Sequence, residues 1–217
     1  MRQKDIFLNS EGDAWFSRNQ QALAERIMPD EDLLICEILE VQKLFNTKPR
    51  ILEIGCGDGT RLAWLKENID AECFGIDPSE KAVLAANAKG IKALQGTADK
   101  LPFDDDSFDI LVFGFCLYLC DREDLFVIAK EADRVLNAPG CLMLMDFFSS
   151  KPQVNTYHHS PGLKSFKMDY RTLFSWHPNY ECMTHKVRHH SELGYTDDLN
   201  EWMAVSTLRK LDRGVHP

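Results

Sequence analysis

Apolar positions follow two different spacings between residues 50 and 147, and each spacing predicts one kind of element. Short continuous apolar runs predict buried strands, whereas apolar positions three and four residues apart predict helices. The strands are expected at residues 50–54, 73–76, 91–95, 108–113 and 141–147, and the helices at residues 60–68, 80–89 and 121–136. Strands joined by helices of about ten residues need crossover connections, which favour a parallel sheet covered on both faces.

The segments on either side of this alternation have weaker patterns. Residues 11–27 and 30–45 carry the spacing of two amphipathic helices, and the second is expected to begin at a cap formed by Asp30. After residue 149 we expect a short helix at residues 169–176 and two more strands at 180–189 and 202–209. The pattern therefore predicts a doubly wound α/β fold in a single domain.

Composition and charge narrow the class of protein. The chain has 217 residues, and its 25 Lys and Arg against 34 Asp and Glu give a formal net charge of −9, so we expect no nucleic-acid partner. The apolar run at residues 110–120 is too short to cross a bilayer, and the first residues lack a secretory signal, which predicts a cytoplasmic protein with no membrane partner. Seven cysteines without a C-x-x-C pair are expected to be reduced, and no metal site is expected.

A glycine-rich turn follows the first predicted strand, with glycine at positions 55, 57 and 59. In an open parallel sheet this turn borders the ligand crevice at the carboxyl ends of the strands. A dinucleotide fingerprint would need its third glycine at position 60, but that residue is Thr60. The neighbouring carboxylates of Glu53 and Asp58 would also repel a pyrophosphate. The turn therefore disfavours a nicotinamide dinucleotide as the ligand.

Four acidic residues are expected to face this crevice: Glu53, Asp58, Asp77 and Asp99. Asp77 ends the second strand, where a carboxylate can accept hydrogen bonds from both hydroxyls of a ribose. A ring of carboxylates favours a cationic ligand. S-adenosylmethionine combines a flat base and a ribose with a sulfonium and an ammonium group, so it fits this set of residues.

Four ordered motifs resemble those of the class I S-adenosylmethionine-dependent methyltransferases, in particular small-molecule enzymes with a type 11-like methyltransferase domain. The motifs are residues 51–60 (ILEIGCGDGT), 75–79 (GIDPS), 96–109, and 134–140 (RVLNAPG). The resemblance implies a Rossmann-like, mostly parallel sheet of seven strands whose last strand is antiparallel. It also implies S-adenosylmethionine as the methyl donor, with S-adenosylhomocysteine as the product.

The resemblance further implies that three parts of the single domain, residues 1–217, have different roles. Residues 1–48 would form an N-terminal helical cap and residues 49–148 the cofactor-binding core. Residues 149–217 would supply the acceptor side and the last two strands.

Individual positions receive roles from the same resemblance. Glu53 and the backbone of the glycine turn would hold the methionine end of the donor, and Asp77 its ribose. The adenine edge falls to Thr97, Ala98 and Asp99; because Thr97 stands where the family usually has an acid, the backbone of Ala98 or the carboxylate of Asp99 would substitute. The full set of cofactor-binding candidates is Trp15, Arg18, Glu53, Gly55, Cys56, Gly57, Gly59, Asp77, Pro78, Thr97, Ala98, Asp99, Phe113 and Gly114.

Two further groups of residues in this set have structural alternatives. Trp15 and Arg18 are expected to form a lid, in which Arg18 pairs with the donor carboxylate and Trp15 covers the methionine chain; the alternative is an amphipathic helix packed on the sheet. Phe113, Gly114 and Phe115 follow the fourth strand and should border the crevice, although aromatic residues there are at least as often part of the core.

The acceptor side is expected in the C-terminal third of the chain, where all seven histidines lie at or after residue 158. His158 and His159 are candidates for a general base, as is Asp146 at the end of the fifth strand. The alternatives are an exposed loop for the histidines and a structural role for Asp146. His185, His189 and His190 suggest either a zinc site or, more simply, a solvated strand face.

The charge of this region sets the expected acceptor. Residues 149–217 hold nine Lys or Arg and seven Asp or Glu, a balance of +2, whereas the preceding residues hold sixteen and twenty-seven, a balance of −11. We therefore expect a polar, anionic small molecule such as a sugar or sugar nucleotide. The competing functions are an inactive S-adenosylmethionine-binding module, an NAD-dependent oxidoreductase, and an RNA methylase.

Overall fold

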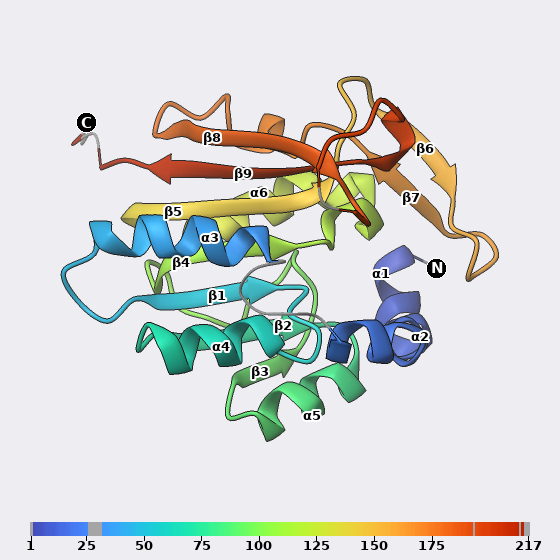
Figure 1. Cartoon of the computed structure of the whole chain (residues 1–217), viewed down its shortest axis with the longest axis horizontal. Helices are drawn as coiled ribbons and strands as arrows, with labels where there is room; N and C mark the ends of the chain where they lie inside the picture. The colour runs from blue at the N-terminus through green and yellow to red at the C-terminus, as the bar shows by residue number, and fades with distance from the viewer. Residues whose placement is uncertain (1, 26–31, 193, 213, 215–217) are drawn as a thin grey trace.

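The computed structural model describes residues 2–25, 32–192, 194–212 and 214, and its centre is a seven-stranded sheet in the order β3-β2-β1-β4-β5-β9-β8 (Figure 1). The strands are β1 (Arg50–Ile54), β2 (Glu72–Asp77), β3 (Lys92–Gln95), β4 (Phe108–Gly114), β5 (Leu136–Phe147), β8 (Tyr180–His189) and β9 (Trp202–Lys210). β1 to β5 pair in parallel, and β9 is antiparallel to both of its neighbours. The prediction of a mostly parallel sheet with an antiparallel last strand is confirmed.

Helices cover both faces of the sheet because strand residues alternate between two apolar cores. One core joins Ile51, Ile110 and Met143 to the helices α3 (Leu33–Val41), α4 (Thr60–Asn68) and α5 (Glu80–Ala88). The other joins Leu52, Leu111 and their neighbours to the helix α6 (Leu125–Val135), which lies behind the sheet in Figure 1. Adjacent residues of a strand therefore point to opposite sides of the sheet.

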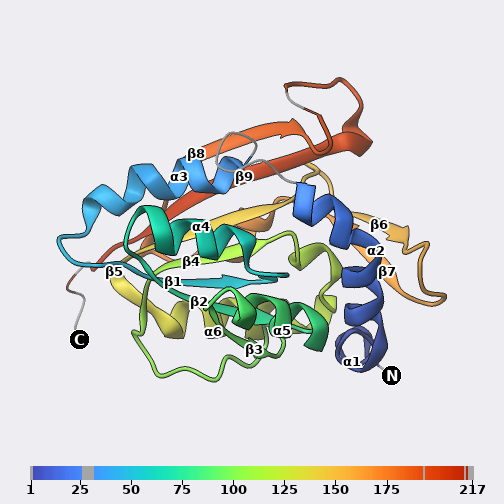
Figure 2. The same cartoon turned by 60° about the horizontal axis from the view of Figure 1, so that its bottom comes forward.

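The N-terminal segment forms a separate layer at the carboxyl ends of the strands. It consists of α1 (Gln3–Ile6), a π-helical turn η1 (Phe7–Glu11) and α2 (Gly12–Glu25), and it lies beyond the arrow tip of β1 in both views (Figures 1 and 2). α2 packs against α5, and a side chain at Gly12 would approach the backbone nitrogen of Ser79, the N-cap of α5, to 3.0 Å. This segment thus covers the edge of the sheet at which a ligand crevice is expected.

Short 3-10 turns and one hairpin complete the described chain. The turns are η2 (Gln42–Leu44), η3 (Leu117–Leu119), η4 (Arg122–Asp124), η5 (Tyr170–Leu173) and η6 (Leu199–Glu201). The hairpin pairs β6 (Gln153–Thr156) with β7 (Lys164–Lys167) outside the main sheet. The apolar pattern missed this hairpin because most of β6 is exposed, so its residues need not alternate.

Several predicted boundaries differ from the observed ones. The expected cap Asp30 lies outside the described residues, and Asp32 caps α3 by accepting hydrogen bonds from two backbone N–H groups. β5 begins at Leu136 and not at residue 141, because residues 137–140 are accommodated by a shift of register opposite β4. The helix predicted at residues 169–176 is only the 3-10 turn η5, capped by Asp169.

All seven cysteines are free thiols in the structure, as expected for reduced residues. Within the described part of the chain, none of the helices is both long enough and apolar enough to pass through a bilayer.

Candidate active site

The turn between β1 and α4 has a backbone that glycine alone adopts readily. Gly55 and Gly57 have φ angles of +77° and +53°. A side chain at Gly55 would come within 2.8 Å of Cys116 Cβ, whereas one at Gly57 would meet no heavy atom within 4 Å. The backbone of Gly55 therefore packs directly against the protein, whereas the backbone of Gly57 is open and can be reached by a ligand.

A cavity of about 580 Å³ opens beside this turn at the carboxyl ends of the strands. Eleven of the predicted cofactor-binding residues line it, and so does the acid Asp58. The eleven are Trp15, Glu53, Gly55, Cys56, Gly57, Asp77, Pro78, Thr97, Ala98, Asp99 and Gly114. Gly59 does not line the cavity; a side chain there would meet Ala86 Cβ at 2.9 Å, so Gly59 instead allows the turn to pack closely on α5.

Asp77 joins the two loops at the centre of this site. Its carboxylate accepts hydrogen bonds from the backbone N–H groups of Gly57 and Ser79, each at 2.9 Å. Burial raises the pKa of Asp77 to about 6. Because a carboxylate has about four lone-pair positions, Asp77 can still accept hydrogen bonds from a ligand.

The other three acids of the expected ring each have a cationic partner. The ion pairs are Glu53–Arg61, Asp58–Lys89 and Asp99–Lys4. The Glu53–Arg61 ion pair is buried, and the Arg61 guanidinium also binds the carboxylate of Asp32 at 2.9 Å. The expectation of four uncompensated negative charges is therefore corrected: charge is largely balanced within the site, and only Asp77, among the described residues of this set, is held by backbone donors in place of a cation.

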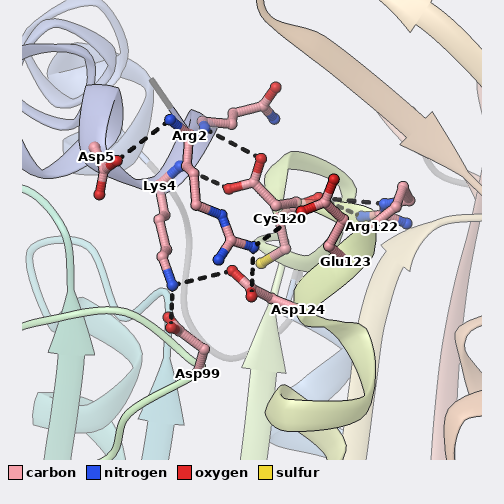
Figure 3. Close-up of polar contacts among 10 residues, drawn as sticks. Arg2, Lys4, Asp5, Asp99, Cys120, Arg122, Glu123 and Asp124 are labelled. Carbon is pink, nitrogen blue, oxygen red and sulfur yellow. Dashed lines mark hydrogen bonds and ion pairs between the residues drawn. The ribbon is translucent and has the colours of Figure 1, made fainter.

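The N-terminal segment is fastened over one side of the cavity by ion pairs and hydrogen bonds (Figure 3). Lys4 lies between Asp99 and Asp124, and the Arg2 guanidinium is 2.6 Å from Asp124. These contacts hold the pKa of Asp99 below its usual range, despite its burial, and raise that of Lys4. Asp99 is thus at the predicted position, but its carboxylate also anchors the segment that covers the cavity.

The structure places the two residues of the predicted lid differently: Trp15 is at the cavity, and Arg18 is not. Trp15 lines the cavity, whereas the guanidinium of Arg18 binds the carboxylate of Glu11 and the hydroxyl of Tyr157, the latter at 3.1 Å. Glu11 is buried and needs a compensating cation, which explains the position of Arg18.

The structure places Phe113 away from the cavity. Its side chain is fully buried in the core on the α6 side of the sheet, as the alternation along β4 requires. Phe115 lines the cavity instead, after the chain turns through a positive φ of 55° at that residue. Both aromatic residues were expected at this edge, and only Phe115 lines the cavity.

Asp146 is a structural residue and does not reach the main cavity. It accepts hydrogen bonds from the backbone N–H groups of Leu117, Tyr118 and Phe147, at 2.8 to 3.2 Å. Burial raises its pKa to about 7. Asp146 therefore shapes η3 and so positions Tyr118, whose ring lines the cavity.

The two predicted histidines in the β6–β7 turn differ in position. His159 lines the cavity, with its ring 5.4 Å from that of Tyr157. His158 is exposed at the tip of the turn and does not line the cavity, which corrects the prediction that it is a catalytic base.

An aromatic cluster that the sequence did not indicate forms the wall above β4 and β5. It consists of Phe115, Tyr118, Phe147 and His190, all of which line the cavity. The Phe147 ring contacts the other three, at centroid distances of 5.3, 5.0 and 5.2 Å. His190 had been assigned to a solvated strand face; it faces the cavity because β8 ends at His189 and the chain turns there.

Part of this chain is similar to a domain found in known proteins. Residues 52–144 match a family model described as a methyltransferase domain. These residues form a methyltransferase domain. The match begins within β1 and ends within β5, so this methyltransferase domain includes the glycine turn, Asp77 and Asp99.

Curated relatives share the methyltransferase domain over part of their length. They include the uncharacterized methyltransferase YcgJ of Bacillus subtilis, 36% identical over 114 residues, which covers 48% of this chain and 43% of that protein. The demethylmenaquinone methyltransferase of Chlorobaculum tepidum is 35% identical over 101 residues, covering 46% and 41%. The match thus spans less than half the length of these relatives.

Solved structures establish the fold of the methyltransferase domain and its surroundings. An S-adenosylmethionine-dependent methyltransferase of Methanosarcina mazei has a TM-score of 0.63 at 18% identity, covering 79% of this chain and 97% of that one. The 1,6-didemethyltoxoflavin-N1-methyltransferase of Burkholderia thailandensis, solved with 1,6-didemethyltoxoflavin and S-adenosylhomocysteine, has a TM-score of 0.71 at 13% identity, covering 96% and 89%.

Proposed function

We propose that this protein transfers the methyl group of S-adenosylmethionine to a hydroxyl or ring nitrogen of a small, flat acceptor. The observation that carries the proposal is a single cavity with two unlike ends. The glycine turn and Asp77 form one end, and the aromatic cluster forms the other. Its volume of about 580 Å³ lies within the usual range for small-molecule sites.

The first end suits the donor. An added side chain at Gly57 would meet only open space, so a ligand can lie against this backbone, and Asp77 can accept hydrogen bonds from ribose hydroxyls. Ala98 and Asp99 are placed for the adenine edge, and Glu53 for the methionine end. When bound, S-adenosylmethionine supplies an activated methyl group with its own leaving group, so these residues need mainly to orient the reactants and exclude water.

The second end suits a flat acceptor better than the expected sugar nucleotide. Aromatic rings pack well against planar molecules and offer no compensation for phosphate charge. Of the basic residues in the expected acceptor region, His159 lines the cavity, whereas Lys164, Lys167 and His158 do not. The names of two relatives point the same way, since demethylmenaquinone and 1,6-didemethyltoxoflavin are ring compounds.

The test is methyl transfer from S-adenosylmethionine with a deuterated methyl group, followed by mass spectrometry of the products. The acceptor panel contains 1,4-dihydroxynaphthalene, catechols, hydroxylated nitrogen heterocycles and sugar nucleotides. We expect labelled product from at least one planar acceptor and none from the sugar nucleotides. Binding of the donor without transfer to any acceptor would favour the inactive binding module, and tighter binding of NAD would favour the oxidoreductase.

A further inference from the structure

His190 is held by Glu201 at two points. Its ring nitrogen Nδ1 lies 2.5 Å from Glu201 Oε2, and its backbone N–H donates to the backbone carbonyl of Glu201 at 2.9 Å. The ring also packs against Phe147 within the aromatic cluster. Glu201 belongs to η6, directly before β9, so the main sheet fixes both partners of this pair.

The carboxylate determines which ring nitrogen of His190 is free to act. An ionised carboxylate only accepts hydrogen bonds, so Nδ1 carries the proton and Nε2 keeps its lone pair on the opposite side of the ring. In the described part of the chain, Nε2 makes no hydrogen bond to another residue, and the ring lines the cavity. Nε2 is thus the basic atom at the acceptor end.

We infer that His190 is the general base of the methyl transfer and that Glu201 is its positioning residue, an inference that rests on the proposed function. As the acceptor oxygen attacks, its O–H bond breaks and the proton passes to Nε2 of His190. The oxygen electron pair forms the new bond to the methyl carbon, and the pair of the broken carbon–sulfur bond stays on sulfur. Glu201 stabilises the resulting imidazolium, which later releases its proton to water.

A metal site is the main competing assignment for these residues. His189, His190 and Glu201 offer ligand atoms within 4.8 Å of one another. However, Nδ1 of His189 accepts hydrogen bonds from the backbone N–H groups of Ser191 and Glu192, at 3.1 and 3.0 Å, which places the ring proton on Nε2. That nitrogen lies 4.0 Å from Glu201 Oε2, so His189 presents a ring proton on the side of Glu201, where a metal would need a lone pair.

The other histidines do not share this arrangement. His159 lines the cavity, but its recorded partner is the ring of Tyr157 and not a carboxylate. His185 is hydrogen-bonded to Ser206 and lies outside the cavity. The titratable and charged groups around His190 are Glu201, its neighbour His189, and Lys167 of β7, which lies 5.0 Å from the Phe147 ring and interacts with Glu201.

The first experiment compares two acceptors that differ in ionisation at pH 8. 1,4-Dihydroxynaphthalene keeps its hydroxyl proton and needs a base, whereas 4-nitrocatechol is already ionised. For the first acceptor, His190→Gln should lower kcat by about 10²- to 10⁴-fold, the usual contribution of a general base. For 4-nitrocatechol the loss should be less than about tenfold, and the exposed His158→Gln should leave both rates unchanged.

Equal losses for both acceptors would overturn the assignment of His190 as a base. An absence of transfer by the wild-type protein to the whole panel would overturn the proposed function itself. A metal site predicts a different pattern: His189→Gln would be as damaging as His190→Gln, and EDTA would abolish the activity until Zn²⁺ is restored.

The second experiment needs no activity. In the protein without ligands, nitrogen-15 NMR of the labelled histidines should show His190 with its proton on Nδ1 at pH 8. Glu201→Gln should shift the ring proton of His190 from Nδ1 toward Nε2, because it replaces a group that only accepts hydrogen bonds with an amide that also donates them. A proton on Nε2 in the wild type, or an unchanged preference for Nδ1 in Glu201→Gln, would overturn the pairing.

Discussion

Asp77 determines the expected pH dependence of donor binding. Its pKa of about 6 means that it is mainly protonated at pH 5 and mainly ionised at pH 7. The ionised form accepts hydrogen bonds from ribose hydroxyls more strongly, so affinity for S-adenosylhomocysteine should rise from pH 5 to pH 7 and then level off. Isothermal titration calorimetry across this range measures the effect.

Asp77→Asn should weaken binding at pH 7.5 by about 10- to 100-fold, since a hydrogen bond to a charged group contributes about 1.5–3 kcal/mol. The variant should also lose the rise in affinity between pH 5 and 7. Asp104→Asn, on the exposed loop before β4, is the control and should bind like the wild type. Wild-type affinity in Asp77→Asn would contradict the ribose role.

Asp146 gives a second pH-dependent prediction, this time for stability. Its pKa is about 7 in the folded protein and near 4 when unfolded. A raised folded pKa contributes stability that is present below pH 4 and is lost as the pH rises to 7. In urea unfolding, Asp146→Asn should reduce the loss of stability between pH 4 and pH 7. The variant should also have a lower free energy of unfolding at every pH, because it disturbs three hydrogen bonds.

Asp104→Asn should keep the wild-type pH slope in the same unfolding series. An unchanged slope in Asp146→Asn would mean that this carboxyl group is ionised throughout and that other residues cause the decline.

At the residue scale, the sequence predicted the donor side better than the acceptor side. The glycine turn and Asp77 were predictable because backbone geometry and strand position dictate them. The ion pairs Asp58–Lys89 and Asp99–Lys4 were not, since they join residues 31 and 95 positions apart. The partners of Arg18 also depend on tertiary contacts, so the sequence could not reveal them, and Arg18 was assigned to the donor carboxylate.

Among the elements, the N-terminal segment is the one whose attachment can be tested most simply. The side-chain amide of Gln3 donates to the carbonyls of Leu119 and Lys164, and its oxygen accepts from the N–H of Lys164 at 3.0 Å. These bonds tie α1 to η3 and to the start of β7. The helical pattern at residues 11–27 predicted α2, but it indicated neither α1 nor these tertiary bonds.

Gln3→Ala should release this attachment and leave buried backbone groups unpaired, at a cost of about 1–3 kcal/mol. We expect faster limited proteolysis within residues 2–25, measured by mass spectrometry of the fragments, and partial protection by S-adenosylhomocysteine. Gln20→Ala, on the exposed part of α2, is the matched control and should be cleaved like the wild type. Equal cleavage of the two variants would show that the segment is held by other contacts.

On the scale of the whole molecule, the order of the strands separates the two ends of the cavity. β2 and β3 lie on one side of β1 and carry the residues assigned to the nucleoside. β4, β5 and β8 lie on the other side, and the aromatic cluster lies at their ends and in η3. The alternation of strands and helices predicted this sheet, because each crossover helix must cover an apolar face. The division of the chain into cap, core and acceptor region stays a prediction.

A crystal structure of the complex with S-adenosylhomocysteine tests the central claim most directly. We predict that the ribose hydroxyls lie within hydrogen-bonding distance of the Asp77 carboxylate, with the methionine-derived chain along Gly55 to Gly57. The sulfur should face the aromatic cluster, where the acceptor is expected. Density for the ligand outside this cavity, or with its sulfur turned away from Phe147 and His190, would contradict the proposed methyl transfer.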